Sequence, residues 1–150
     1  ERGLANPSLG TLRLIAANLD VPMFSFFDYT SSTKAHLVKK QDRVRIIRGK
    51  SDSNELELGY DLLSPDLEGV VQLCEMTLGP KQISSDKLNS HDAEEVAVCT
   101  EGTIELHLEN DVVTLQKGDS IRLDNNTPHL WKNPTNEICA IIFALSPPTF

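Results

Sequence analysis

Three side chains in this sequence have the chemistry to bind one metal ion together, namely His91, Glu95 and His129. Imidazole nitrogens and a carboxylate suit iron, manganese, zinc, nickel or copper, and two histidines with one carboxylate form the facial triad of many non-haem iron sites. His91 and Glu95 stand at the start of one predicted strand, and His129 starts another more than thirty residues later. Since spacing alone does not bring distant residues together, the alternative is that all three are ordinary surface or rim residues.

If Glu95 and His129 point into a common pocket, strand alternation predicts which neighbours join them. The predicted inward side chains are Ala97, Cys99, Trp131 and Asn133. We therefore count Cys99 and Trp131 among the candidate ligand-binding residues, although a tryptophan serves equally well in a core or a dimer interface. Arg122 is a further candidate because a guanidinium grips an anion through two parallel hydrogen bonds, the alternative being a solvated strand arginine.

Hydrophobic periodicity predicts the elements that position these residues. From about Val38 onward, short alternating or apolar runs recur between turn signals, which is typical of strands. The nine runs are Arg43–Ile47, Leu56–Leu62, Val70–Leu78, Glu95–Thr100, Thr103–Leu108, Val112–Leu115, Ser120–Leu123, His129–Lys132 and Ile138–Leu145. So many short strands in about a hundred residues predict a mainly β fold, either a sandwich or a barrel.

The amino-terminal part has a helical period instead. Asn6-Pro7-Ser8 predicts a helix start, and Val21-Pro22 predicts its end. The apolar stripe between them, at steps of three and four, is Leu9, Leu12, Ile15, Ala16 and Leu19. Met23 to Phe27 reads as a short, very apolar second helix, and a polar linker follows it.

The two segments that carry the triad resemble the two sequence motifs of the cupin family. Asn89-Ser90-His91-Asp92-Ala93-Glu94-Glu95, followed by Gly102, resembles the first motif, in which two histidines precede a glutamate and then a glycine. The stretch from Gly118 through Thr127-Pro128-His129 to Asn133 resembles the second motif. The resemblance covers about residues 38–145 and implies a cupin double-stranded β-helix (jelly-roll) barrel with the triad at its mouth. It allows one divalent transition metal there, zinc, iron, manganese or nickel, and otherwise no cofactor.

The sequence also departs from these motifs at three positions. Asn89 stands where the family has the first histidine, and Asp124 and Asn126 replace the usual proline and glycine of the second motif. A neutral amide oxygen is a poor ligand for a transition metal beside an imidazole, so Asn89 is at most a weak fourth ligand. The departures leave open whether the site binds a metal.

The first residues resemble the back half of a lambda-repressor-like (Xre-type) helix-turn-helix domain. Glu1-Arg2-Gly3 matches the residues that close the recognition helix, and Pro7-Ser8 with Thr11-Leu12 matches the opening of the next helix. We therefore expect residues 1–29 to be the remnant of this DNA-binding domain, without most of its recognition helix. Residues 30–37 would be a linker and residues 38–150 the cupin sensor domain. The alternative is an amphipathic helix pair docked on a barrel.

Together the two resemblances imply a transcriptional regulator of the Xre-cupin class. A small-molecule effector at the barrel mouth would change the operator affinity of a homodimer, and the domain would have no catalytic activity. The alternative is a metal-dependent cupin enzyme, of the dioxygenase or isomerase type, that uses the same triad. A third possibility is a cupin that simply binds or stores a ligand.

Composition sets further bounds on these readings. Hydrophobic residues make up 39% and charged residues 24% of the 150, and no apolar run approaches the ~20 residues needed to span a bilayer. Three widely spaced cysteines predict buried thiols in the cytoplasm. The net charge of −8 predicts that this segment alone binds DNA poorly. With Glu1 in place of an initiator methionine, and no signal peptide, we expect a piece of a longer chain.

Overall fold

The structure, a computed structural model, describes residues 9–19, 35–47 and 58–149. In these ranges it has one α-helix, α1 (Leu9–Leu19), and one short 3-10 helix, η2 (Lys40–Asp42). The strands are β1 (Arg45–Ile47), β2 (Gly59–Leu62), β3 (Gln72–Leu78), β4 (Glu94–Glu101), β5 (Thr103–Leu108), β6 (Val112–Gln116), β7 (Ser120–Leu123), β8 (His129–Lys132) and β9 (Cys139–Ser146). Each falls on one of the nine predicted runs, and three have the predicted bounds.

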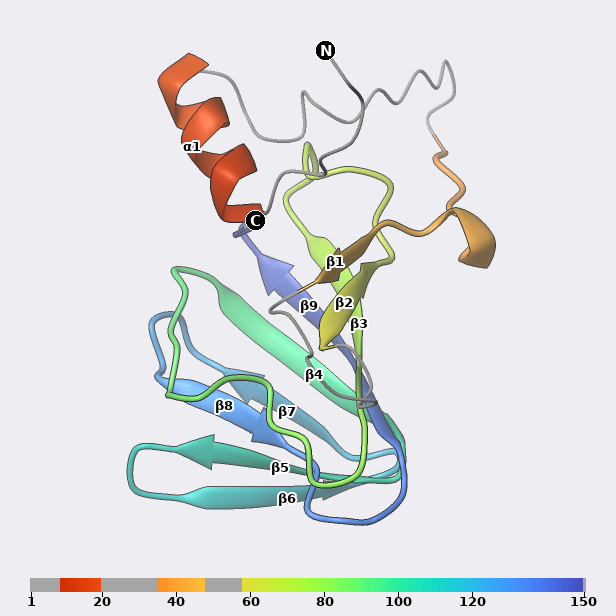
Figure 1. The fold of residues 1–150 in the computed structure, drawn as a ribbon, viewed down its shortest axis with the longest axis vertical. Coiled ribbons are helices and arrows are strands. Elements are labelled where there is room, and N and C mark those ends of the chain that lie inside the picture. The colour runs from red at the N-terminus through yellow and green to blue at the C-terminus, as the bar shows by residue number, and fades with distance from the viewer. Residues whose placement is uncertain (1–8, 20–34, 48–57, 150) are drawn as a thin grey trace.

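The strands form two antiparallel sheets that face each other and close into a barrel (Figure 1). One sheet has six strands in the order β1-β2-β3-β9-β4-β7, and the other has three in the order β6-β5-β8. The last strand, β9, lies between β3 and β4, so the chain returns to the middle of the larger sheet. The architecture is the predicted jelly-roll barrel, and the fold is mainly β.

The barrel interior is filled by alternate side chains of the strands. In β3 the inward residues Cys74, Met76 and Leu78 are fully buried, and in β5 Ile104 and Leu106 are fully buried. This is the alternation expected where one face of a strand is removed from water, and it fixes the register, because a slip of one residue would expose the apolar set.

Two glycines allow the turns that connect β4, β5, β6 and β7. Gly102 has a φ of +69° and Gly118 a φ of +98°, conformations that a side chain disfavours. A Cβ atom at Gly102 would also lie 2.7 Å from the carbonyl oxygen of Ile138, the residue before β9. Gly102 therefore allows both the turn and the close approach of the neighbouring backbone.

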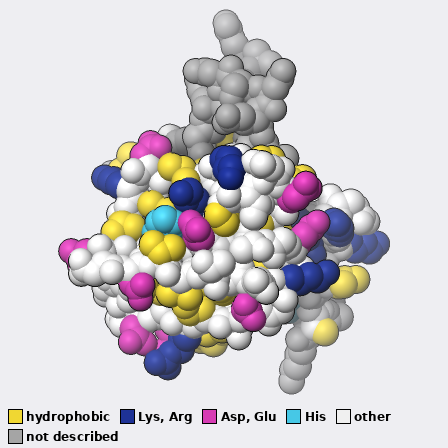
Figure 2. Space-filling view, turned by 90° about the horizontal axis from the view of Figure 1, so that it is seen from below, with side chains coloured by type: hydrophobic (Ala, Val, Ile, Leu, Met, Phe, Trp, Pro, Cys, Tyr) yellow, Lys and Arg dark blue, Asp and Glu magenta, His cyan; other side chains and the backbone are white. Residues whose placement is uncertain are grey.

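The helix α1 coincides with the amphipathic segment predicted between Ser8 and Val21. The predicted short helix at Met23 to Phe27 and the residues expected to close a recognition helix lie outside the described residues. Neither described helix is long and apolar enough to cross a membrane. On the barrel face seen in Figure 2, acidic and basic side chains are interspersed among apolar ones, with no extended basic surface among the described residues.

Candidate functional site

Three elements bring the predicted triad to one end of the barrel. Glu95 lies on the inward face of β4, His129 begins β8, and His91 lies in the loop before β4. An isolated bridge ties this loop to β8, since the backbone N–H groups of Asn89 and His129 each donate to the carbonyl of the other at 3.0 and 2.9 Å. The two motifs are therefore held side by side by backbone hydrogen bonds.

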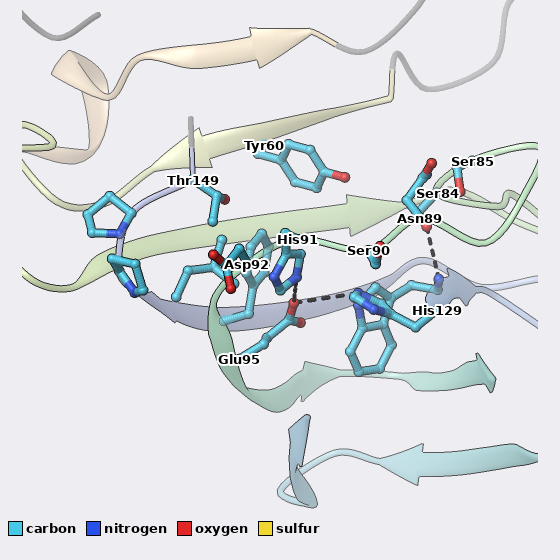
Figure 3. Close-up of a pocket in the computed structure, with 15 residues that line it drawn as sticks. Tyr60, Ser84, Ser85, Asn89, Ser90, His91, Asp92, Glu95, His129 and Thr149 are labelled. Atoms are coloured by element: carbon cyan, nitrogen blue, oxygen red, sulfur yellow. Dashed lines mark hydrogen bonds and ion pairs between the residues drawn. The ribbon is translucent and has the colours of Figure 1, made fainter. Parts of the chain in front are cut away.

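The predicted convergence of the triad is confirmed (Figure 3). His91 Nε2 lies 3.0 Å from Glu95 Oε2, and His129 Nε2 lies 3.6 Å from the same oxygen. The two imidazole rings are 5.3 Å apart and nearly perpendicular. One potential ligand atom from each of the three residues lies within 4.8 Å of the other two.

Backbone carbonyls orient both imidazole rings. His91 Nδ1 lies 3.1 Å from the carbonyl of Ala93, and His129 Nδ1 lies 2.8 Å from the carbonyl of Thr127. Because a carbonyl only accepts, each Nδ1 carries the hydrogen, and in a neutral ring the lone pair is on Nε2, which faces Glu95. Metal-binding histidines are commonly oriented in this way.

Burial and the histidines act in opposite directions on the ionisation of Glu95. Burial raises the pKa of its carboxyl group, but hydrogen bonds and charge from His129 and His91 outweigh burial and leave the pKa below its usual value. Burial lowers the pKa of His129, whereas its bonds to Glu95 and to the Thr127 carbonyl raise it, and the net pKa is raised. Glu95 is thus a carboxylate at neutral pH, and His129 holds a proton more tightly than an isolated histidine.

The second oxygen of Glu95 is the feature that most clearly indicates a ligand. Glu95 is 2% exposed, and its Oε1 atom is buried without a hydrogen-bond partner. Leaving a charged acceptor without a donor costs free energy, so such an atom calls for a functional explanation. A divalent cation bound between Glu95 and the two imidazoles would compensate the carboxylate, and the donor set therefore fits a transition metal.

The triad lies in a cavity of about 530 Å³ at the mouth of the barrel. Its lining consists of Tyr60, Ser84, Ser85, Asn89, Ser90, His91, Asp92, Glu95, His129, Trp131, Phe143, Leu145, Pro147, Pro148 and Thr149. The cavity is much larger than a metal ion needs, so it has room for a small organic molecule.

Several of these lining residues were not among the sequence candidates. Tyr60 and Phe143 pack edge to face, with ring centroids 5.5 Å apart, and both come from predicted strands. Alternation within β9 would have placed Phe143 inward together with Ile141 and Leu145. The segment 147–149 follows the last strand and has no sequence signal of its own, although the Thr149 N–H donates to Gln72 Oε1 at 3.2 Å and holds it near β3.

Trp131 and Asn89 both line the cavity, as predicted, in different ways. The ring of Trp131 is 4% exposed and its centroid is 6.5 Å from that of His129, so it forms a wall beside the triad. Asn89 lies on the same side of the cavity as Ser84 and Ser85, and its side chain is directed away from Glu95 (Figure 3). Nothing in this arrangement supports Asn89 as a fourth metal ligand.

Two predicted ligand-binding residues do not line the cavity. Arg122 is opposite Val96 in the β4–β7 register, and since Glu95 and Ala97 point inward, Val96 and Arg122 point outward. The guanidinium is 62% exposed and pairs with Asp124 at 3.1 Å and Glu94 at 3.8 Å. Arg122 is thus a solvated strand arginine, and the prediction that it grips a ligand is wrong.

Cys99 is the second predicted ligand-binding residue that does not line the cavity. The prediction that it points inward is confirmed, since it is 1% exposed. It lies two alternations beyond Glu95 along β4, however, and its thiol faces the carbonyls of Glu101 and Gly102 at 3.5 Å. Cys99 is therefore a core residue below the cavity.

Asn126 explains how the chain tolerates its departure from the second motif. Its φ is +59°, a conformation that suits glycine and that asparagine tolerates better than most other residues. Its N–H donates to the His91 carbonyl at 2.8 Å and its side-chain amide donates to Asp92 Oδ1 at 3.1 Å. The turn before β8 thereby fixes the loop that carries His91.

The described residues thus form an antiparallel jelly-roll barrel with a histidine–glutamate–histidine cavity at its mouth. Residues 74–145 match the family model described as the cupin domain, so this chain contains a cupin domain. None of the curated proteins compared with the chain matches it.

Solved structures with this fold include regulator domains and enzymes. The cupin domain of an XRE family transcriptional regulator from Enterobacter cloacae is 18% identical with a TM-score of 0.54, and the match covers 61% of this chain and 97% of that one. An HTH_3 family transcriptional regulator from Vibrio cholerae is 21% identical with a TM-score of 0.56, covering 99% and 76%. The polyketide cyclase RemF from Streptomyces resistomycificus is 18% identical with a TM-score of 0.61, covering 77% and 81%. At these identities the likeness establishes the fold alone.

Proposed function

We propose that this chain is the ligand-sensing part of a transcriptional regulator, in which a small molecule in the cavity changes the operator affinity of the intact dimer. The observation that carries the proposal is the extent of the likeness to the Vibrio cholerae regulator, which covers 99% of this chain and so includes α1 as well as the barrel. The helix-turn-helix resemblance of residues 1–29 supports the same division, with a linker at 30–37 and the sensor at 38–150.

The position of the cavity suits such a role. Residues 147–149 line it, and in Figure 1 α1 lies beyond the same end of the barrel. A ligand at the mouth is then at the end of the barrel beyond which α1 lies. Linkage requires only that the ligand bind one dimer geometry better than another. We further propose that the regulator acts in the cytoplasm, where DNA is accessible.

The test uses the intact regulator, with the complete DNA-binding domain that this proposal implies. Selection from genomic DNA fragments is expected to enrich one sequence with two symmetric half-sites, because a homodimer reads both. Enrichment of no sequence would contradict the proposal. A segment that begins at Ala35 is the matched control and is expected to enrich nothing.

A second experiment connects the cavity to regulation. Ser90 is exposed and lines the cavity, so Ser90→Trp should fill part of the space without disturbing the core. Reporter expression from the selected operator is expected to differ between this variant and the wild type. Asn136→Trp, in an exposed loop outside the lining, is the control that should leave expression unchanged.

A metal-dependent enzyme is the second candidate function, favoured by the triad itself and by its open cavity. A divalent metal there would act as a Lewis acid or as a centre for oxygen chemistry. His91, Glu95 and His129 would hold it, and the aromatic wall would exclude water and orient a substrate. Mass spectrometry separates the two functions: a sensor releases its bound molecule unchanged, whereas an enzyme with metal present releases a product of different mass.

A further inference from the structure

The cavity lining is strongly biased in charge. Among the described residues it contains two carboxylates, Asp92 and Glu95, and neither lysine nor arginine. The cation that the sequence suggested for this role, Arg122, lies on the outer face and pairs with acidic neighbours. With a net charge of −8 for the chain, an anionic molecule would meet repulsion at long range. Within the described lining only the two histidines could offer it positive charge, and both face Glu95.

Glu95 places an incompletely compensated negative charge beside the cavity. Its carboxylate is buried, and Oε1 has no hydrogen-bond donor. Both imidazole Nε2 atoms face Oε2 of Glu95, so Oε1 receives no donor from the described residues. An anion in the same place would add a third negative charge beside two carboxylates. The low effective dielectric constant of a partly buried site would strengthen that repulsion.

The remaining lining suits the other parts of an amine. Tyr60, Trp131 and Phe143 provide aromatic surface for an apolar body, and aromatic faces attract organic cations. The side-chain oxygens of Asn89 and Ser90 are acceptors. An ammonium group has three N–H donors and no acceptor, so it matches a lining rich in oxygen.

We propose that the effector of this cavity is a small organic cation, whose ammonium group lies against Asp92 and Glu95 and whose apolar body lies against the aromatic wall. This inference rests on the proposed sensor function and specifies the chemical class of its ligand. The cavity of about 530 Å³ accommodates an amine with a single ring.

Three probes of matched shape and different charge test the proposal: 2-phenylethylamine, 2-phenylethanol and 3-phenylpropanoate. Binding to the 150-residue chain is measured by saturation-transfer NMR and calorimetry, with a chelator present so that no metal can partner the carboxylate. The amine is expected to bind at least about tenfold more tightly than the alcohol, and the carboxylate not to bind at millimolar concentration. Equal or tighter binding of the carboxylate, or no binding of the amine at millimolar concentration, overturns the proposal.

Variants locate the charge that selects the amine. Asp92→Asn and Glu95→Gln keep shape and remove charge, and each should weaken the amine about tenfold while leaving the alcohol within about twofold. Asp92 is exposed, so its variant remains informative if the buried Glu95→Gln fails to fold. Glu137→Gln is the matched control, an exposed carboxylate outside the lining. An unchanged amine affinity in a folded Asp92→Asn protein would contradict the placement of the ammonium group.

The failure of this inference can be distinguished from the failure of the proposed function. Ligand charge preference is measured on this chain, whereas operator selection is measured on the intact protein. If the chain prefers the carboxylate and the intact protein selects an operator, only the proposed ligand class is wrong. If the chain prefers the amine and the intact protein selects no operator, the regulator function is wrong and the ligand class stands.

Discussion

At the scale of single residues, the triad is defined by what each atom faces. Two Nε2 atoms converge on one oxygen of Glu95, and both Nδ1 atoms are bound to carbonyls. The backbone therefore sets the ring orientations, so no free energy is needed to order the rings when a metal binds. This preorganisation favours metal binding by a site with only three protein ligands.

The first prediction concerns metal affinity. Zinc titration of the wild-type chain by calorimetry is expected to show one site that involves His91, Glu95 and His129. Glu95→Gln and His129→Gln should each weaken binding at least about a hundredfold, because each removes one of three ligands. His107→Gln is the matched control, since His107 pairs with Glu105 outside the cavity and its loss should change nothing. Tight zinc binding by the Glu95→Gln protein would rule out this site.

The second prediction concerns pH and follows from the raised pKa of His129, whose ordinary value is 6.5. The contribution of His129 to the stability of the metal-free protein is complete below that ordinary value, and it is lost as pH rises through the raised one. Zinc needs the neutral ring, so zinc affinity should change in the opposite direction and fall as pH drops through the raised pKa.

Denaturant unfolding and zinc titration from pH 8 to about pH 6.5 check these opposite trends. Taking the difference between wild type and His129→Gln cancels the contributions of groups that do not interact with His129. Glu95, whose pKa is lowered, stabilises the fold above its ordinary value of 4.5 and does not interfere in this range. Parallel pH trends in stability and affinity would contradict the ion pair between His129 and Glu95.

At the scale of elements, the sequence predicted the positions of strands better than the directions in which their side chains point. Thr103–Leu108 was predicted with its correct bounds because its alternation is regular and its ends are marked by turns. Arg122 was misplaced because the outward direction of β7 depends on its register with β4, and pairing between distant strands has no local signal. Triad convergence came from the motifs of a known family, since spacing alone could not establish it.

Asn133 shows a motif residue whose role becomes clear only in the folded chain. It was predicted to point inward, and it is fully buried. Its amide donates to the carbonyls of Leu78, Gly79 and Glu137, and its oxygen accepts from Thr135, so it anchors the loop between β8 and β9. Asn133 therefore supports the element that carries His129 and does not line the cavity itself.

The third prediction compares two glycines of the same barrel. Gly102→Ala must accept a positive φ and a contact of 2.7 Å with the Ile138 carbonyl, so it should lower the free energy of unfolding by about 2–4 kcal/mol. Gly118→Ala shares the positive φ, but nothing lies within 4 Å of its Cβ, and it should cost about 1–2 kcal/mol. Urea unfolding measures both. Equal losses would mean that the backbone conformation alone, and not the approach of β9, requires glycine at Gly102.

At the scale of the whole molecule, the barrel separates a polar mouth from a closed apolar interior. The three cysteines lie on β3, β4 and β9, which are adjacent in the larger sheet, and all are buried and free. Burial raises the pKa of the Cys74 and Cys139 thiols to about 11, and it also raises that of Cys99. These thiols are structural, which agrees with the expectation of buried cysteines drawn from their spacing.

The fourth prediction uses these thiols to measure opening of the barrel. At pH 8 a thiol of pKa about 11 is roughly one-thousandth ionised, and burial excludes the reagent as well, so a disulfide-exchange reagent should label no thiol rapidly in the folded chain and all three in denaturant. Because β3, β9 and β4 hold one another by continuous pairing, no cysteine can be exposed by fraying of one edge strand. Slow labelling should therefore give one common rate for all three thiols, and Gly102→Ala should accelerate all of them equally. Rapid labelling of Cys74 alone, which pairs with the cavity-lining Phe143, would show instead that the mouth opens separately from the rest of the barrel.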